Sequence, residues 1–215
     1  MTSEQDAKAR LAEMPDVSRE TMARLEVYHD LTLKWTPKIN LVSKSAQASL
    51  WERHFLDSAQ LWEFRPHGAK RWIDLGSGGG FPGMVIAIIA AQAAPELHVT
   101  LIESDARKCA FLRTVAREAC IDATVLNQRA EDLPPNQADV VSARALAPIA
   151  TLLGYAGRIL RPGGVCLFLK GRQHDKELEA AAEMWSFEVT KAPSLTDPDG
   201  AILKIKDISR ERLPD

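Results

Sequence analysis

The sequence has few cysteines, no long apolar run and almost no net charge. Its three cysteines, Cys109, Cys120 and Cys166, show no Cys-x-x-Cys spacing, which argues against a disulfide framework or a metal site. An odd, sparse count is typical of a reducing compartment. The N-terminus lacks the apolar core of a signal peptide, and no apolar run approaches the roughly 20 residues of a membrane span. We therefore expect a soluble, cytoplasmic protein without a bound metal or a membrane partner.

The formal net charge of −2 excludes a polycation that binds nucleic acid through its global charge. Charge is nevertheless uneven, because residues 34–71 hold seven basic residues against three acidic ones, a local net of +4. Such a run is more often a solvated face than a binding surface. If it carries phosphate contacts instead, RNA affinity should fall steeply with added salt. The basic residues are Lys34, Lys38, Lys44, Arg53, Arg65, Lys70 and Arg71.

The first 68 residues have helical patterns. Ser18 can cap a segment whose apolar residues recur every three or four positions up to Pro37. Ser49 can cap a second segment, which ends at the turn sequence Arg65-Pro-His-Gly68. We place a boundary there, between an N-terminal helical region (1–68) that packs on the core and a cofactor-binding domain (69–215).

After residue 68, short strand candidates alternate with helical stretches, which predicts an α/β fold with a parallel, doubly wound sheet. Two further strand candidates flank the turn sequence Thr196-Asp-Pro-Asp-Gly200, which predicts an antiparallel hairpin at the sheet edge. The candidates are Arg71–Leu75, His98–Glu103, Ala123–Asn127, Asp139–Ser142, Val165–Lys170, Phe187–Lys191 and Ala201–Asp207.

A glycine-rich turn, Gly76-Ser-Gly-Gly-Gly-Phe81, follows the first strand candidate. It fails the dinucleotide pattern GxGxxG, because Phe81 replaces the third glycine, and it fits acid-x-Gly-x-Gly-x-Gly with Asp74 as the acid. A carboxylate in this position would repel a pyrophosphate by ~4 kcal/mol at 4 Å for an effective dielectric near 20. It would attract the ammonium and sulfonium groups of S-adenosylmethionine. We expect Asp74, Gly76 and Gly78 to bind that cofactor; the alternative is a tight turn without a ligand.

Two later strand ends carry further candidates. Glu103 ends the second strand, where a carboxylate can accept bonds from both ribose hydroxyls of a cofactor. Capping of the next helix by Ser104 or Asp105 would leave Glu103 free. After the third strand, residues 128–132 offer a backbone N–H and an acid for the adenine edge, with a solvated loop as the alternative.

With these residues in hand, the chain resembles the bacterial 16S rRNA guanine-N7 methyltransferase family RsmG, formerly called glucose-inhibited division protein B (GidB). The similarity runs from about residue 20 to residue 206. Many methyltransferases share such glycine turns, but the combination of Phe-Pro-Gly with the upstream Arg53–Ser58 segment is far more specific. The motifs are Lys34-Trp35, Ile39-Asn40-Leu41, Arg53-His-Phe-Leu-Asp-Ser58, Asp74–Gly83, Arg129-Ala-Glu131, Ser142-Ala-Arg-Ala145 and Leu169-Lys-Gly171.

The resemblance implies a class I methyltransferase fold with a seven-stranded sheet, and S-adenosylmethionine as the methyl donor. It implies methylation of N7 of a guanine, guanine 527 in the 530 loop of 16S rRNA. We expect the protein to be a monomer whose N-terminal helices face the RNA. The partner is 16S rRNA or the small ribosomal subunit. Implied cofactor contacts are Gly76, Phe81, Ala130, Glu131 and Arg144, and the polar residues implied to face cofactor or RNA are Asn40, His54, Arg129, Arg144 and Lys170.

One departure from the family is Ser142-Ala143-Arg144, where relatives place serine directly before the arginine. The departure could shift a hydroxyl away from the site. The arginine itself is retained.

Guanine N7 carries a lone pair and no proton, so its methylation needs alignment, worth ~7–11 kcal/mol, and no general base. The sequence agrees by omission: it lacks an Asn/Asp-Pro-Pro-Tyr/Phe element for an exocyclic amine and a Pro-Cys nucleophile for cytosine C5. Arg144 and Lys170, expected beyond the ends of the fourth and fifth strands, could hold the base or its phosphate. Solvated loop cations are the alternative.

His54 lies on the apolar side of its helix and is more readily a core residue than a base. Asn40 is similarly more readily a turn or cap residue.

Three rival functions stay open. A small-molecule methyltransferase would share everything from Asp74 to Glu131, but such enzymes usually close the site with a dry apolar lid. Asp74 and Phe81 disfavour a nicotinamide oxidoreductase. A non-catalytic RNA-binding module is the third. Residue patterns alone support a methyltransferase, whereas guanine, N7 and the ribosomal substrate come from the resemblance.

Overall fold

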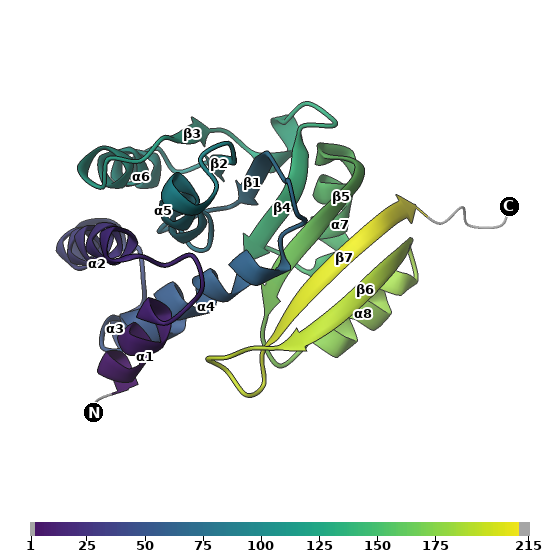
Figure 1. Cartoon of the computed structure of the whole chain (residues 1–215). Helices are drawn as coiled ribbons and strands as arrows, with labels where there is room; N and C mark the ends of the chain where they lie inside the picture. Colours follow the sequence, from purple (N-terminus) through teal and green to yellow (C-terminus); the bar gives the residue numbers. More distant parts are fainter. Residues whose placement is uncertain (1–2, 211–215) are drawn as a thin grey trace, which may run out of the picture.

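A sheet of seven strands forms the centre of the protein, which the computed structural model describes from residue 3 to residue 210 (Figure 1). The strands lie in the order β3-β2-β1-β4-β5-β7-β6. Strands β1 to β5 pair in parallel, whereas β7 pairs antiparallel with both β5 and β6. The predicted fold class is confirmed: α/β, with a mostly parallel sheet, an antiparallel C-terminal hairpin and N-terminal helices.

The strand boundaries follow the apolar runs of the sequence. The first three strands begin and end at the predicted residues. Pairing extends β4 to Arg144 and carries β5 back across Pro162 to Leu160, so both are longer than predicted. The strands are β1 Arg71–Leu75, β2 His98–Glu103, β3 Ala123–Asn127, β4 Ala138–Arg144, β5 Leu160–Lys170, β6 Trp185–Pro193 and β7 Ala201–Arg210.

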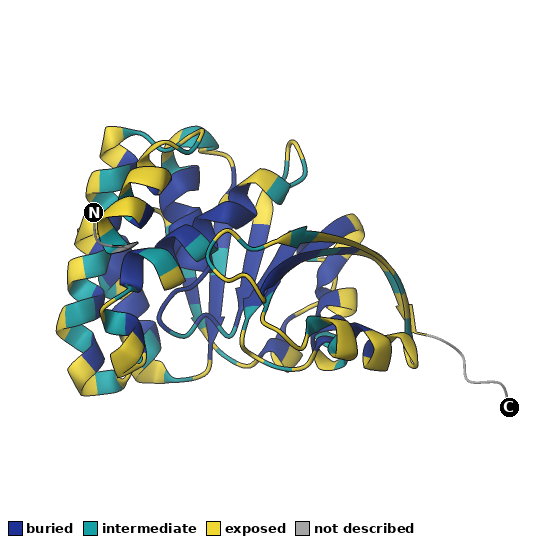
Figure 2. Cartoon of the chain, turned by 90° about the horizontal axis from the view of Figure 1, so that it is seen from below, coloured by how far each residue is buried: buried dark blue, intermediate teal, exposed yellow. Residues whose placement is uncertain are grey.

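Helices cover both faces of the sheet (Figure 1). One face carries α5 (Gly83–Ala93) and α6 (Ala106–Glu118), and the long N-terminal helix α2 (Arg19–Ile39) packs against both of them. The other face carries α7 (Ile149–Ile159) and α8 (His174–Ala182). Buried residues gather on the sheet and on the helix sides that face it, as Figure 2 shows. Burial on both faces explains the nearly continuous apolar runs of the central strands.

Ser18 caps α2 as predicted, since its Oγ accepts a hydrogen bond from the Thr21 N–H at 3.1 Å. The helix does not stop at Pro37. It ends at Asn40, which adopts the left-handed conformation (φ 51°) and donates its backbone N–H to the Thr36 carbonyl at 2.9 Å. Asparagine tolerates this conformation better than most residues, so the C-cap reading of Asn40 is confirmed.

The second helical segment has three forms: a π-helix (η1, Trp51–Leu56), a turn of α-helix (α4, Asp57–Ala59) and a 3₁₀-helix (η2, Gln60–Phe64). The predicted cap at Ser49 is wrong. The carboxylate of Glu4, on α1 (Ser3–Ala12), accepts the Trp51 N–H at 3.0 Å and so satisfies the first free donor of η1. A short helix, α3 (Lys44–Gln47), precedes the segment and is capped by Ser43.

The N-terminal helices share a core with the sheet. Tyr28 of α2 and Phe55 of η1 are fully buried, and both belong to one apolar cluster with Met84 of α5 and Phe111 of α6. Tyr28 lies 5.0 Å from Phe55 and 6.3 Å from Phe111 between ring centres. A division of function between residues 1–68 and 69–215 stays a prediction.

The chain reverses its direction of progress across the sheet at β1, which lies between β2 and β4. In open α/β sheets, ligands bind beyond the carboxyl ends of the strands at such a point. At the amino ends of the parallel strands, Asp139 of β4 accepts the backbone N–H groups of Lys70 and Arg71 at 2.7 and 2.9 Å and pairs with Arg161. These charged groups at the amino ends therefore stabilise the fold. Within residues 3–210, no helix combines the length and apolar character needed to cross a membrane.

Candidate active site

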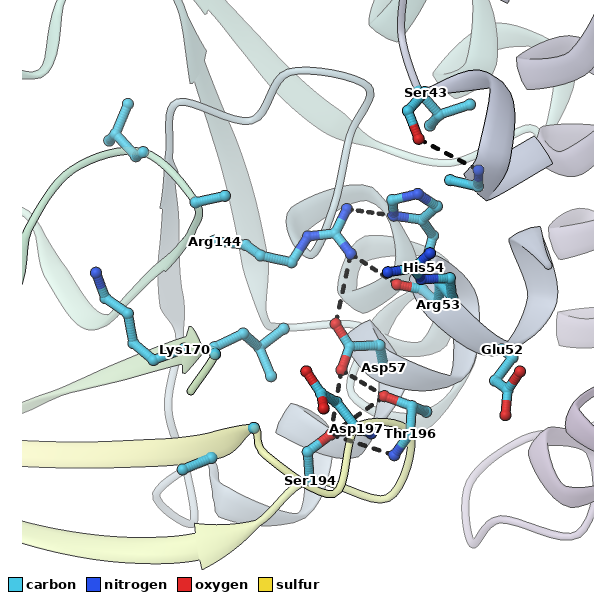
Figure 3. Close-up of a pocket in the computed structure, with 18 of the residues that line it drawn as sticks. Ser43, Glu52, Arg53, His54, Asp57, Arg144, Lys170, Ser194, Thr196 and Asp197 are labelled. Carbon is cyan, nitrogen blue, oxygen red and sulfur yellow. Dashed lines mark hydrogen bonds and ion pairs between the residues drawn. The ribbon is translucent and has the colours of Figure 1, made fainter. Parts of the chain in front are cut away.

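A cavity of about 1010 Å³ lies at the carboxyl ends of β4 and β5, and residues of η1 and of the loop between β6 and β7 also line it (Figure 3). We call it the Arg144 cavity. Its size is at the upper end of the range, about 300–1,000 Å³, of sites that bind small molecules. The residues that line it and enter the argument are Arg53, His54, Asp57, Arg144, Leu146, Lys170, Glu177, Ser194 and Thr196.

Arg144, the last residue of β4, is held on one side of this cavity by three acceptors. Its guanidinium donates to His54 Nδ1 at 2.5 Å and to the Arg53 carbonyl at 3.0 Å, and it lies 3.4 Å from Asp57 Oδ2 (Figure 3). Burial lowers the pKa of Arg144, and the charge of Asp57 opposes that shift. An arginine stays charged in proteins, so the cavity contains a fixed cation.

His54 is neutral in this arrangement. Burial lowers the pKa of His54 to about 3, and the charge of Arg144 lowers it further in the same direction. Because Arg144 donates to Nδ1, the proton is assigned to Nε2, which is buried and has no hydrogen-bond partner within residues 3–210. The imidazole therefore orients the arginine and has no free lone pair with which to remove a proton.

Asp57 connects Arg144 to the β6–β7 loop. Its Oδ1 accepts hydrogen bonds from Thr196 Oγ1 at 2.8 Å and from Gln60 Nε2 at 2.9 Å. Gln60 Oε1 in turn accepts the Leu195 N–H at 2.9 Å. Burial raises the pKa of the Asp57 carboxyl, and Arg144 opposes the rise. Hydrogen bonds thus connect α4, the end of β4 and the β6–β7 loop on one side of the cavity.

Lys170, the last residue of β5, lines the same cavity, but its ammonium group already has protein partners. Its Nζ donates to the Ala147 carbonyl at 2.7 Å and to Glu177 Oε2 at 2.8 Å, and the side chain is only 8% exposed. Glu177 also accepts the Ile149 N–H at 3.0 Å. Lys170 therefore holds the loop after β4 and the start of α7 in place.

The glycine turn adopts a backbone that other residues rarely adopt. Gly76, Gly78 and Gly80 all have positive φ angles, of 62°, 58° and 98°. A Cβ on Gly76 would lie 2.4 Å from a methyl group of Leu146, and a Cβ on Gly80 would lie 2.5 Å from the Tyr28 hydroxyl. At Gly78, by contrast, a Cβ would meet only a carbonyl oxygen at 3.8 Å. The turn is packed on both flanks and open over Gly78, so a ligand can approach its backbone there.

Helix α2 holds this turn through Tyr28. The buried hydroxyl donates to the Gly79 carbonyl at 2.5 Å, and the ring stacks on Phe81 with 5.1 Å between centres. The Phe81 ring also lies 4.8 Å from the His54 ring and 5.2 Å from the Arg144 guanidinium carbon. Because these neighbours surround the ring, a cofactor contact by Phe81 would have to come from its backbone.

The structure corrects the role expected of Asp74. Its side chain is fully buried, and Oδ1 accepts a hydrogen bond from Ser142 Oγ at 2.6 Å. Oδ2 is directed at Gly83, where a Cβ would lie 2.7 Å away. The carboxylate therefore faces the start of α5 inside the protein and does not line the Arg144 cavity, so the expectation that its charge faces a cationic cofactor is wrong.

Ser142, the departure from the family pattern, is part of this buried chain of bonds. It lies beside Asp74 in the register of β1 and β4, and it accepts the Trp72 indole N–H at 2.8 Å. The hydroxyl is thus directed into the sheet, away from the cavity.

Glu103 is less free than expected. Asp105 caps α6 as predicted, accepting the Arg107 N–H at 2.8 Å. The Glu103 carboxylate nevertheless accepts the Gly78 N–H and the Asp105 N–H, both at 2.8 Å. It braces the glycine turn from the end of β2. A carboxylate has about four acceptor positions, so two of these bonds leave room for ligand hydroxyls.

The remaining predicted residues lie at two other places. Ala130 and Glu131 form a 3₁₀ turn (η3, Ala130–Asp132) after β3, and Arg158 donates to both of their carbonyls at 3.1 and 2.7 Å. Arg129 directly before them is exposed. Asn40 lines a second cavity near the end of α2 and does not line the Arg144 cavity.

The structure thus brings Arg144, His54 and Lys170 to one cavity, and it puts Gly78 and Glu103 in direct contact. Gly78 and Glu103 fit a nucleoside cofactor. The open turn at Gly78 leaves room for the aliphatic part of the cofactor, and the Glu103 carboxylate has acceptor positions left for ribose hydroxyls.

Sequence reasoning missed Tyr28, Asp57 and Leu146. The three-residue spacing of His54 and Asp57 on a helix was the one available signal for Asp57. Tyr28 had the periodicity of a core residue. The contact of Leu146 with Gly76 depends on the loop after β4, for which the sequence offered no pattern.

Comparisons with known proteins give a consistent result. A profile of the family described as rRNA small subunit methyltransferase G matches residues 21–203. Ribosomal RNA small subunit methyltransferase G of Cereibacter sphaeroides is 50% identical, over 95% of this chain and 97% of its own. The protein of the same name from Paramagnetospirillum magneticum is 52% identical, over 91% and 93%.

Solved structures share the fold at low identity. An O-methyltransferase from Bacillus cereus in complex with S-adenosylhomocysteine has a TM-score of 0.59 at 14% identity, covering 93% of this chain and 96% of its own. Aeropyrum pernix fibrillarin with bound S-adenosylmethionine has a TM-score of 0.50 at 17% identity, covering 64% and 66%.

The buried Asp74 carboxyl predicts a pH-dependent stability. Burial raises the pKa of Asp74 from 3.8 to about 6, so the folded state binds this proton more tightly than the unfolded state. The cost of burying the charge is present above pH 6 and is relieved as pH falls towards 4. In urea unfolding, the stability of Asp74→Asn relative to wild type should therefore fall by up to about 3 kcal/mol between pH 7 and pH 4.

Asp122→Asn, at an exposed position, is the matched control and should show no such change relative to wild type. A constant difference between wild type and Asp74→Asn across this range would contradict the assignment.

Proposed function

The chain belongs to the rRNA small subunit methyltransferase G family, and from this premise we propose that it methylates N7 of a guanine in 16S rRNA. The nucleotide implied by the family resemblance is guanine 527 in the 530 loop. The substrate is 16S rRNA or the small ribosomal subunit, and residues 1–68 supply part of the surface that meets it.

S-adenosylmethionine is the cofactor, and when bound it supplies a methyl group activated by a sulfonium. We assign its binding to the glycine turn at Gly76 and Gly78, to Glu103 for the ribose hydroxyls and to the turn at Ala130 and Glu131. In the structure, Gly78 and Glu103 are joined by a 2.8 Å hydrogen bond and Tyr28 holds the same turn from behind. These contacts fix the turn and the carboxylate that we assign to the cofactor.

One observation carries the choice of N7: the cavity beside the glycine turn contains a fixed hydrogen-bond donor, Arg144, and its histidine has no free lone pair with which to remove a proton. The Arg144 guanidinium only donates hydrogen bonds, and His54 is neutral with its acceptor nitrogen occupied. Asp57 and Glu177 are already bonded to Arg144 and Lys170. Guanine N7 needs no proton removed, and its N7 and O6 acceptors suit an arginine fork.

Arg144 is therefore assigned to orient the base, and His54 and Asp57 to orient Arg144. Catalysis rests on holding N7 in line with the methyl group, since orientation alone can supply ~7–11 kcal/mol. Lys170 shapes the cavity by holding the loop at Ala147. Arg129, exposed beyond β3, and Asn40 are assigned to the outer part of the RNA surface.

Tyr28→Phe should weaken cofactor binding, because it removes the bond to the Gly79 carbonyl and leaves that carbonyl without its donor. A loss of about 1 kcal/mol corresponds to a roughly fivefold higher Kd for S-adenosylhomocysteine by calorimetry. Thr32→Val, which removes a buried hydroxyl bonded to the Tyr28 carbonyl on the same helix, should lower stability and leave this Kd unchanged. Equal Kd values for Tyr28→Phe and wild type would contradict the role.

Arg144→Ala should lower kcat for rRNA methylation by at least about 100-fold, a loss of about 3 kcal/mol in the transition state, while circular dichroism shows a folded protein. Arg53→Ala removes a cation from the same cavity, but only its backbone carbonyl bonds Arg144. It should change kcat by less than about threefold. Retained turnover in Arg144→Ala would remove this residue from the site.

The position of methylation is tested with 16S rRNA transcripts that carry guanosine or 7-deazaguanosine, assembled into small subunits where naked RNA is not accepted. Transfer of a labelled methyl group should occur with guanosine and disappear with 7-deazaguanosine, which has carbon in place of N7. Nucleoside analysis of the product should give 7-methylguanosine. Equal transfer to both transcripts would rule out N7.

A further inference from the structure

A second cavity, of about 460 Å³, lies where α2 ends and α6 begins. We call it the basic groove, defined by its nine lining residues: Thr36, Pro37, Lys38, Ile39, Asn40, Val42, Lys44, Gln47 and Arg107. It is separate from the Arg144 cavity, although Val42 lines both. Apart from Val42, none of the residues that line the Arg144 cavity lines this groove.

The charge of the basic groove has one sign. Three of its nine described lining residues are cations and none is acidic. Arg107 pairs with Asp105 at 2.9 Å, so its charge is partly balanced. Lys38 and Lys44 are exposed and form no ion pair within residues 3–210. Two uncompensated ammonium groups therefore face one recess, an arrangement that attracts an anion.

The groove lies beside the catalytic region. The segment Leu41–Val42 separates it from the Arg144 cavity, and the Leu41 carbonyl is 3.3 Å from the position of a Cβ on Gly79. The segment thus lies against the glycine turn, with a cavity on either side. A polynucleotide whose base occupies the Arg144 cavity would carry its neighbouring backbone across this segment.

The structure also separates the basic run at residues 34–71 into unlike parts. Lys70 and Arg71 lie at the start of β1, at the amino ends of the parallel strands and therefore far from the cavities. Arg65 pairs with Asp16 and stacks on Trp62 at 3.7 Å. Lys38 and Lys44 are left at the groove and Arg53 at the Arg144 cavity. The run is therefore not one continuous patch.

We propose that the basic groove binds a backbone phosphate of the rRNA next to the target nucleotide, through Lys38 and Lys44. The inference rests on the proposed function, because it takes rRNA as the substrate. Phosphate contacts fix the register of a protein on nucleic acid without reading its sequence. The groove would then place the target guanine in the Arg144 cavity.

The test is the double variant Lys38→Gln/Lys44→Gln, with binding to 16S rRNA measured by fluorescence at several KCl concentrations. Loss of one to two phosphate contacts should lower affinity roughly three- to tenfold near 0.15 M salt. It should also reduce the slope of log affinity against log salt by about 1 to 2. The Kd for S-adenosylhomocysteine should stay at the wild-type value, because the cofactor turn is untouched.

Lys34→Gln is the matched control. Lys34 lies one turn earlier on α2, is exposed and carries the same charge, but it does not line the groove. Its salt slope should equal that of wild type. An unchanged slope in the double variant, or an equal decrease in Lys34→Gln, would overturn the proposal. Methyl transfer by the wild-type protein is measured in parallel: its absence contradicts the proposed function, whereas its presence with unchanged slopes contradicts the groove alone.

Discussion

The guanidinium of Arg144 is the group around which the site is organised. A half-buried, permanently charged donor is tolerated only when acceptors compensate for its lost water. The π-helical segment provides the His54 nitrogen and the Arg53 carbonyl, and the Asp57 carboxylate beside them is held by Thr196 of the β6–β7 loop. Segments from the start, middle and end of the chain are therefore joined at one side chain, and the cavity owes its shape to that junction.

The glycine turn depends on the same N-terminal helices. Tyr28 of α2 bonds the Gly79 carbonyl and stacks on Phe81, while the other neighbours of Phe81 include His54 and Arg144. The turn that we assign to the cofactor and the arginine that we assign to the base thus share one aromatic support. A reaction that relies on alignment requires the two parts to be held rigidly relative to each other, and this packing provides that rigidity.

Charged side chains differ in their partners between the amino ends and the carboxyl ends of the parallel strands. Around the amino ends of the strands, cations and carboxylates are paired for structure, as at Asp139 and Arg161. Near the carboxyl ends, Arg144 and Lys170 pair with Asp57 and Glu177, whereas Lys38 and Lys44 form no ion pair within residues 3–210. A protein with a net charge of −2 can in this way present a local cationic surface to a polyanion.

The sequence by itself determined the sheet, because apolar runs and turn residues are local signals: β1, β2 and β3 begin and end where their patterns do. It also determined the glycine turn and, through the motifs at residues 53–58 and 74–83, the family. Only the tertiary structure decided where side chains point. Asp74 faces the start of α5 and does not line the Arg144 cavity, and Glu103 accepts the Gly78 N–H of the turn. Asp57 and Tyr28 join the site through contacts with Arg144 and Gly79. These residues are far apart in the chain, and local patterns do not specify which distant residue a side chain will meet.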